Sequence, residues 1–196
     1  MIYTIKKVNE AIHWENIPAM TIDNVLWTAD TGVRGQGQLC YDNERLYVHL
    51  SAAEKDIRAE YTQPLSPVHE DSCLEFFFQP EGWENYFNIE VNPNGCACIQ
   101  VGPCRGDRID IVRRSDASYF DIRTNRTEGG WDVFYHIPLK FIRLFCPSYR
   151  FEGTLYANLY KCGDKTIAPH YLSWAPIDLP KPDFHCPAYF GKMIFE

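Results

Sequence analysis

The most regular alternation of apolar and polar residues lies between positions 69 and 95, in the stretch HEDSCLEFFFQPEGWENYFNIEVNPNG. Apolar residues occupy every second position of 74–78 and again of 87–91. A period of two places alternate side chains on one face of a β-strand. Residues 80–85, between the two runs, contain the Pro, Gly and Asn that are typical of a turn. The stretch therefore predicts a β-hairpin.

The apolar pattern also predicts how the two strands pair. If Phe78 lies opposite Phe87, every inward position meets another apolar residue, and Glu75 lies opposite Glu90 on the other face. Like charges at opposite positions are destabilising, so we expect a cation, an arginine or a hydroxyl-rich ligand beside them. A shift of two residues would pair Glu75 with Asn88 and remove this argument. Solvated or arginine-bound carboxylates remain the alternative explanation.

Further alternating runs follow along the chain, punctuated by Gly and Pro. Residues 131–137 give the clearest, with Trp131, Val133, Tyr135 and Ile137 on one side. Residues 1–30 are predicted to be irregular and 139–145 to form a short helix. Strands are predicted at 36–41, 45–52, 96–101, 109–113, 119–124, 151–161 and 189–195. Roughly ten strands at this spacing predict an all-β fold, a two-sheet antiparallel β-sandwich, immunoglobulin-like or jelly-roll-like, as a single domain over residues 1–196.

The composition indicates a folded domain and argues against some classes of binding partner. Hydrophobic residues make up 45% of the 196 residues and aromatic residues 15%, enough for a full core. The net charge of −7 argues against nucleic acid as a partner. The arginines between 105 and 126 alternate with Asp107, Asp110, Asp116 and Asp121, which indicates a solvated surface. No apolar run is long enough for a membrane span and no leader pattern is visible, so a cytoplasmic location is predicted, with a trimmed export signal as the alternative.

The chain has eight cysteines, at positions 40, 73, 96, 98, 104, 146, 162 and 186. Without a leader peptide, reduced and mostly buried thiols are expected. Cys96, Cys98 and Cys104 are the tightest group. A zinc site usually needs a second pair or histidines at matching spacing, and this group has neither, so free thiols are favoured over a metal site.

Seven segments in a fixed order resemble family 9 carbohydrate-binding modules and their DOMON-like relatives. The matching segments are YDNERLYVHL (41–50), EDSCLEFFFQP (70–80), YFNIEVNPNG (86–95), WDVFYHIPL (131–139), YANLYKCG (156–163), SWAP (173–176) and FHCPAYFG (184–191). The resemblance implies a β-sandwich that binds a sugar between two tryptophans, with carboxylate, arginine and amide groups on its hydroxyls. It also implies that a structural calcium ion can be bound.

The resemblance places the family's binding residues on particular positions of this chain. Its acidic residue falls on Glu75 and its amide on Asn158. Its two tryptophans fall near His69 and Phe184, and its arginine falls on Glu90. Trp174 or Trp83 would then supply the missing ring. The predicted ligand-binding residues are therefore Glu75, Glu90, Asn88, Asn158, His69, Trp174 and Phe184.

These residues predict a non-catalytic domain that binds a mono- or oligosaccharide and that acts beside a glycoside hydrolase. Three alternatives stay open. The paired carboxylates are compatible with a retaining glycosidase. A stand-alone interaction domain would keep the fold and lose the sugar site. A haem domain would need methionine and histidine side by side, and Met1, Met20 and Met193 lack such a neighbour on a predicted strand.

Overall fold

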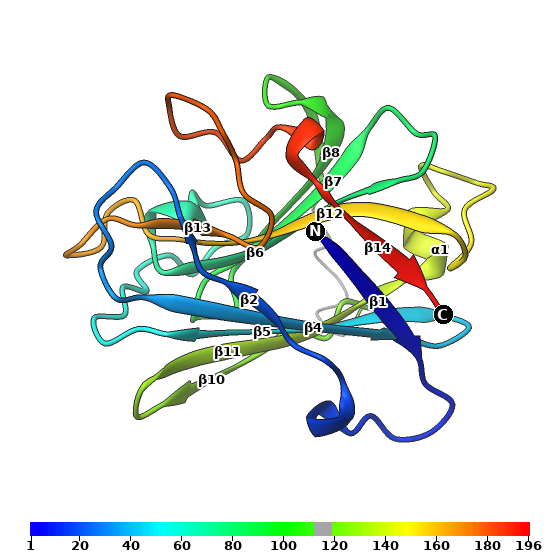
Figure 1. Ribbon diagram of the computed structural model, residues 1–196, viewed down its shortest axis with the longest axis horizontal. Helices are drawn as coiled ribbons and strands as arrows, with labels where there is room; N and C mark the ends of the chain where they lie inside the picture. The colour runs from blue at the N-terminus through cyan, green and yellow to red at the C-terminus, as the bar shows by residue number, and fades with distance from the viewer. Residues whose placement is uncertain (112–118) are drawn as a thin grey trace.

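The computed structural model describes residues 1–111 and 119–196, and these residues form fourteen strands and one short α-helix (Figure 1). Short 3-10 turns lie at Trp14–Asn16, Val68–Glu70 and Pro187–Tyr189. The elements are β1 (Ile2–Lys7), β2 (Met20–Ile22), β3 (Asn24–Val25), β4 (Arg34–Tyr41), β5 (Arg45–Ala53), β6 (Cys73–Pro80), β7 (Tyr86–Val91), β8 (Ala97–Cys104), β9 (Asp107–Asp110), β10 (Arg123–Thr127), β11 (Gly130–Pro138), α1 (Leu139–Ile142), β12 (Thr154–Cys162), β13 (Tyr171–Ser173) and β14 (Gly191–Phe195).

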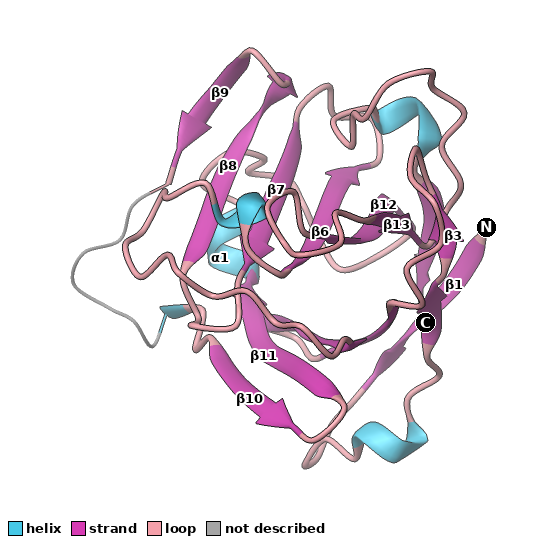
Figure 2. Cartoon of the chain, turned by 90° about the vertical axis from the view of Figure 1, so that its left-hand side faces the viewer, coloured by secondary structure: helices cyan, strands magenta, loops and turns pink. Residues whose placement is uncertain are grey.

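The strands form two layers that β1 joins at one side (Figures 1 and 2). One layer has the order β10-β11-β5-β4, and the other has the order β14-β12-β6-β7-β8-β9. Residues Ile2 to Ile5 of β1 pair with β14, while Lys6 and Lys7 pair with β4. The all-β sandwich with one short helix is thus confirmed, as a curled and mixed sheet. None of the helices within the described residues is long and apolar enough to span a membrane.

The first thirty residues were predicted to be irregular, and this prediction is wrong. They contain β1, β2 and β3, and β1 runs parallel to both of its neighbours, so the sandwich is not purely antiparallel. The alternation was present, because Tyr3 and Ile5 are buried between exposed residues. Its partners, β14 and β4, are distant in sequence, so no local turn signal announced the pairing.

Several strand ends differ from the predicted ranges. The turn expected at Gly102-Pro103 lies inside β8, and the strand expected at 119–124 begins at Arg123 instead. The strand expected at 109–113 is β9, which ends at Asp110, and residues 112 and 113 lie outside the described residues. The helix expected at 139–145 is the single turn α1.

The main core lies between the two layers and is built from the predicted inward positions. Leu46, Val48 and Leu50 of β5 are fully buried there, as are alternate residues of β6, β7 and β11. The hairpin of β6 and β7 has the predicted register, with Phe78 opposite Phe87 and Glu75 opposite Glu90. This register sends Glu75 and Glu90 to the outer face of the sheet.

A second apolar cluster covers that outer face. Loops from residues 26–27, 61–68 and 177–190 fold over β6, β7 and β12. Phe77, Tyr86 and Tyr160 are fully buried beneath these loops. Strand β6 is therefore buried on both faces, and its outward residues lie at a protein interior instead of at the solvent.

A buried ion pair joins the two layers near the end of β12. Lys161 Nζ lies 3.2 Å from Glu54 Oε2 and donates to His170 Nε2 at 2.7 Å. Ser72 Oγ and Trp131 Nε1 donate to the same carboxylate at 2.8 and 3.2 Å. Burial and the neighbouring Lys161 lower the pKa of His170 to about 4, so this imidazole stays neutral and accepts a hydrogen bond from Lys161.

Two adjacent glycines at the start of β11 give a matched test of the β5–β11 contact. A Cβ atom at Gly130 would lie 1.8 Å from the Ala52 carbonyl oxygen, whereas one at Gly129 would meet nothing within 4 Å. Gly130→Ala should therefore lower the free energy of unfolding by at least about 2 kcal/mol, because backbone must move. Gly129→Ala should change it by less than about 0.5 kcal/mol. Urea unfolding of both variants measures this, and equal losses would contradict it.

Removal of the buried lysine should expose the cost of an unpaired charge. Lys161→Met keeps the length of the side chain and leaves Glu54 without its cation, which should cost about 3–5 kcal/mol of unfolding free energy. The control is Lys165→Met, which removes an exposed lysine paired with Glu70 at 3.0 Å and should change little. Denaturant unfolding gives both values. A Lys161→Met protein as stable as wild type would contradict this prediction.

Candidate functional site

A cavity of about 370 Å³ lies on the outer face of β6, β7 and β8, beneath the covering loops. Its floor is the sheet, and its walls are the loops at 65–69 and 182–185 together with Trp27 and Tyr171. Three larger hollows lie elsewhere, two beside α1 and one along β5, and none of the seven predicted residues lines any of them. The residues that line the cavity are Trp27, Leu65, Ser66, Pro67, His69, Glu75, Glu90, Cys98, Gln100, Arg105, Arg108, Cys162, Asp164, Tyr171, Pro182, Asp183, Phe184 and His185.

Two buried carboxyl groups form the floor. Glu75 and Glu90 are 2% and 5% exposed and lie opposite each other across β6 and β7. Cys162 Sγ donates to Glu75 Oε1 at 2.9 Å, and Asn88 Nδ2 donates to Glu90 Oε1 at 2.9 Å. Burial raises the pKa of both groups, and the adjacent Glu90 raises that of Glu75 further. The floor can therefore offer a protonated carboxyl as a donor beside carboxyl acceptors.

Aromatic rings form one wall. Phe184 stacks on Tyr160 with 4.1 Å between ring centroids, and Trp27 lies 5.6 Å from Phe184 and 5.8 Å from Tyr171. Trp27 Nε1 donates to the Leu179 carbonyl at 2.6 Å, which fixes the indole ring. Trp27 is half-buried, so part of its ring remains open to the cavity.

Two residues that line the cavity have a left-handed backbone conformation, which raises the conformational energy of any residue other than glycine. Trp27 has φ of 56° and Leu65 has φ of 60°. Each such residue costs about 1–3 kcal/mol and persists where the surroundings hold it. Among the described residues, Asp121 is the third non-glycine residue with positive φ, and it lies elsewhere. The strain is thus concentrated at this cavity.

Two arginines from β9 and the preceding turn form the cationic side. Arg105 pairs with Asp183 at 2.9 Å, and Arg108 contacts the His185 imidazole. Burial and the adjacent Arg108 lower the pKa of His185 to about 2, so the ring is neutral. The prediction that this arginine-rich segment is only a solvated surface is therefore wrong for Arg108, which is half-buried, whereas Arg105 is exposed as predicted and also lines the cavity. Residues 112–118 of the segment lie outside the described residues.

The loop that carries His69 is fixed by a buried aspartate. Asp71 is fully buried, and its Oδ2 accepts from the backbone N–H groups of Glu60 and Tyr61 at 3.0 and 2.9 Å and from Asn92 Nδ2 at 2.9 Å. Arg58 pairs with its other oxygen. These bonds hold the loop against the sheet while His69 stays exposed at the rim of the cavity.

The structure brings four of the seven predicted residues together. Glu75, Glu90, His69 and Phe184 line the cavity. Asn88 lies behind Glu90, where it donates to Glu90 and to Gln100 Oε1 at 3.2 Å. Asn88 is thus a positioning residue for the floor, and its own contact with a ligand stays a prediction.

Asn158 and Trp174 do not line the cavity, which corrects their predicted role. The Asn158 amide accepts from Ala175 N at 2.8 Å and donates to Ala175 O at 2.9 Å, so it is occupied by backbone. Trp174 is 3% exposed in the main core, against Gly191, where an added Cβ would lie 2.6 Å from the ring. The SWAP segment thus braces the sheet, and Trp27 supplies the indole at the cavity.

Several residues that line the cavity were not predicted, because the local sequence pattern around them does not indicate where their side chains lie. Trp27 lies within residues 1–30, which were predicted to be irregular. Gln100, Arg108 and His185 reach the cavity through the β8–β9 hairpin and the long proline-rich loop before β14. One signal was available for Gln100, because it lies directly opposite Asn88 in the next strand.

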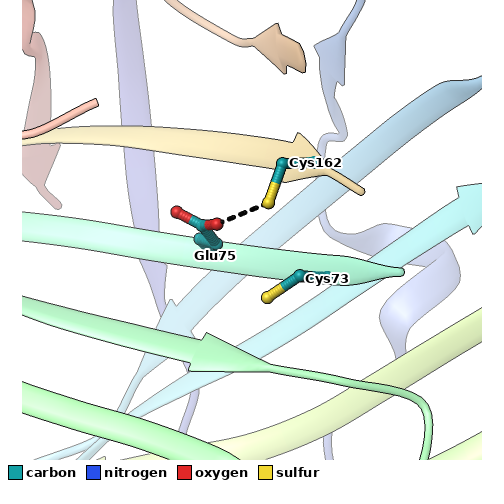
Figure 3. A group of neighbouring side chains, drawn as sticks. All are labelled: Cys73, Glu75 and Cys162. Carbon is teal, nitrogen blue, oxygen red and sulfur yellow. Dashed lines mark hydrogen bonds between the residues drawn. The ribbon is translucent and has the colours of Figure 1, made fainter. Parts of the chain in front are cut away.

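Within the described residues, the side chains of metal-binding type that converge are Cys73, Glu75 and Cys162 (Figure 3). The described cysteines are all free thiols, as the sequence predicted, and four of them are buried. Cys96, Cys98 and Cys104 do not form such a group. Calcium prefers six to eight oxygen ligands, so the thiol-rich group does not suit it. The calcium site stays a prediction.

The two-layer sandwich with a loop-covered cavity on its outer face places the chain among β-sandwich domains. The chain belongs to carbohydrate-binding family 9, whose family model matches residues 6–195. No curated protein matches it. It is similar to the structure of a candidate carbohydrate-binding protein from Bacteroides uniformis ATCC 8492, with 28% identity, a TM-score of 0.84, and coverage of 100% of this chain and 99% of the other.

Two further structures share the fold. They are those of a family 9 carbohydrate-binding module from Caldicellulosiruptor kristjanssonii in complex with glucose and in complex with cellotriose. Each is 14% identical with a TM-score of 0.70, and each match covers 100% of this chain and 96% or 94% of the other. At this identity the likeness shows the fold alone.

The raised pKa of Glu75 has a consequence for stability. Above its ordinary pKa of 4.5, the unfolded state loses the proton that the folded state keeps, so unfolding becomes easier as the pH rises. Glu75→Gln removes this titration. Its stability relative to wild type should therefore increase as the pH rises above the ordinary pKa of 4.5. Urea unfolding across this range measures it, with Glu81→Gln, in the exposed turn after β6, as the charge-loss control. A constant difference between Glu75→Gln and wild type would contradict it.

Proposed function

We propose that this protein is a non-catalytic saccharide-binding domain, and that the cavity over β6, β7 and β8 is its sugar site. One observation carries the proposal: a single cavity brings aromatic rings together with carboxyl, guanidinium and amide groups. A pyranose has an apolar face of C–H groups and a rim of hydroxyls, and these two kinds of side chain suit it. Membership of carbohydrate-binding family 9 supports the same conclusion.

The residues that line the cavity have different proposed roles, according to the chemistry of their side chains. Trp27 takes the stacking role that the sequence analysis gave to Trp174, because it is fixed by Leu179 and half-open to the cavity. Glu90 and Gln100 accept from sugar hydroxyls, and Arg108 donates. The buried, protonated Glu75 acts as a donor. His69 closes the rim. The ligand is a monosaccharide or the end of a short oligosaccharide, as in the glucose and cellotriose complexes of the Caldicellulosiruptor module.

Glucose and cellotriose are the sugars to test first, by calorimetry and by thermal melting. A ligand that binds only the folded state stabilises it by about 2.7 kcal/mol at one hundred times its dissociation constant. Glu90→Gln keeps the shape of the floor and replaces a carboxyl oxygen acceptor with an amide NH₂ that cannot accept a hydrogen bond, so affinity should fall at least about tenfold, equivalent to about 1.4 kcal/mol. The control is Glu81→Gln, which should bind as wild type does.

Two results would count against the site. If Glu90→Gln binds sugar as wild type does, the ligand lies elsewhere. If neither these sugars nor a wider panel of saccharides shifts the melting temperature, the interaction-domain alternative replaces the proposal.

The glycosidase alternative uses the same two carboxyl groups. A retaining mechanism needs one ionised nucleophile about 5–5.5 Å from a general acid. Burial raises the pKa of both Glu75 and Glu90, which disfavours the anion. Assay of the protein on a panel of aryl glycosides decides the matter. A glycoside hydrolase as partner and a cytoplasmic location stay predictions.

A further inference from the structure

Two thiols and a carboxyl group meet at the floor of the cavity, and saccharide binding accounts for the carboxyl group of Glu75 alone. In the antiparallel pair of β12 and β6, Cys162 lies directly opposite Cys73, and Glu75 follows two residues later on the same face. The ligand atoms of the three residues lie within 4.8 Å of one another. All three are buried, at 0–2% exposed. Figure 3 shows the thiol of Cys162 directed at the carboxyl of Glu75.

The three side chains bond mainly to one another. Cys162 Sγ donates to Glu75 Oε1 at 2.9 Å, and the Cys73 and Cys162 thiols also hydrogen-bond each other. Their contacts with backbone carbonyls are long, at 3.6 Å from Cys162 to His69 and 3.9 Å from Cys73 to Leu74. Among the described residues, no lysine, arginine or histidine forms an ion pair with Glu75. Lys161, whose charge acts on Glu75, pairs with Glu54 instead. The carboxyl and the two thiols are therefore buried together without an ion-pair partner within the described residues.

We propose that Cys73, Glu75 and Cys162 form a binding site for a thiophilic divalent cation, with zinc as the best fit. Two thiolates select zinc over calcium or magnesium, and a carboxylate completes a common ligand set. Zinc bonds of about 2.3 Å to sulfur and about 2.0–2.2 Å to oxygen place tetrahedral ligand atoms about 3.5–3.8 Å apart. Such a spacing lies within the 4.8 Å limit, and the 2.9 Å Cys162–Glu75 contact has to widen by less than 1 Å.

The fourth ligand position faces the cavity. Glu75 and Cys162 line the cavity, and Cys73 lies below them. A site with three protein ligands and one open position holds water or a ligand oxygen there. Binding exchanges protons for the metal: the two thiols and the carboxyl release their protons to the buffer, and the site changes from neutral to a net charge of −1.

Cobalt(II) is the probe for the experiment, because its thiolate charge-transfer absorption reports Co–S bonds directly. The full-length protein is reduced with a phosphine, treated with a chelator, and titrated with cobalt(II) and then zinc in the absence of sugar. We expect one equivalent of cobalt with thiolate absorption, which zinc abolishes. Calorimetry of zinc binding in buffers of different ionisation enthalpy should show proton release. Cys73→Ser and Cys162→Ser should each weaken binding at least about 100-fold.

The chain offers two matched controls. Cys40→Ser replaces a buried thiol on β4, and Cys98→Ser replaces a thiol that lines the same cavity. Both variants should bind cobalt as wild type does. Thermal melting shows whether each serine variant is folded, and the wild-type titration needs no variant at all.

Three results would overturn the proposal. They are wild-type protein that gives no thiolate absorption, absorption that survives in both Cys73→Ser and Cys162→Ser, and a Cys73–Cys162 disulfide that forms in air while the reduced protein takes up no cobalt. Because the titration contains no sugar, its failure leaves the saccharide proposal intact, and a missing sugar response leaves the metal site intact.

Discussion

The structure depends on the two-residue period of β6, a strand that is buried on both faces. Its inward phenylalanines fill the core between the layers, and its outward residues, Cys73, Glu75 and Phe77, lie under the loops that cover the sheet. A slip of one residue would exchange these two sets and place carboxyl groups in the core. The register with β7 and β12 is therefore strongly determined. It fixes the floor of the cavity before any loop contributes to it.

Buried carboxyl groups in this fold are accommodated in two different ways. Glu54 receives a lysine, a serine hydroxyl and an indole N–H, so its charge is compensated inside the protein. Glu75 has only a thiol donor and a like-charged neighbour, and burial raises its pKa. The first arrangement joins the two layers. The second leaves a buried carboxyl group without an ion pair among the described residues. A buried polar group that the fold does not compensate is typical of a functional site.

The sequence was most informative for the central hairpin, whose two strands are close together along the chain. The β6–β7 register, and with it the pairing of Glu75 and Glu90, followed from alternation and one turn. Alternation cannot say what covers a face. Trp174 and Asn158 have the right residue types, yet the first fills the core and the second binds backbone. Trp27, Arg108 and His185 reach the cavity through loops and an edge hairpin, whose positions are set by tertiary contacts.

The site differs from the residues that the resemblance implies, yet it keeps the same kinds of side chain. The reason is that loops and edge strands, and not only the central strands, contribute to the cavity. The implied arginine position carries Glu90, yet a guanidinium reaches the cavity from β9, two strands away, as Arg108. The implied tryptophan near residue 184 is Phe184, yet Trp27 lies 5.6 Å from its ring. The aromatic ring and the positive charge are thus supplied by other elements whose side chains line the same cavity. The sheet restricts the cavity to one place, while the loops, which tolerate change, set which groups fill it and hence which ligand it selects.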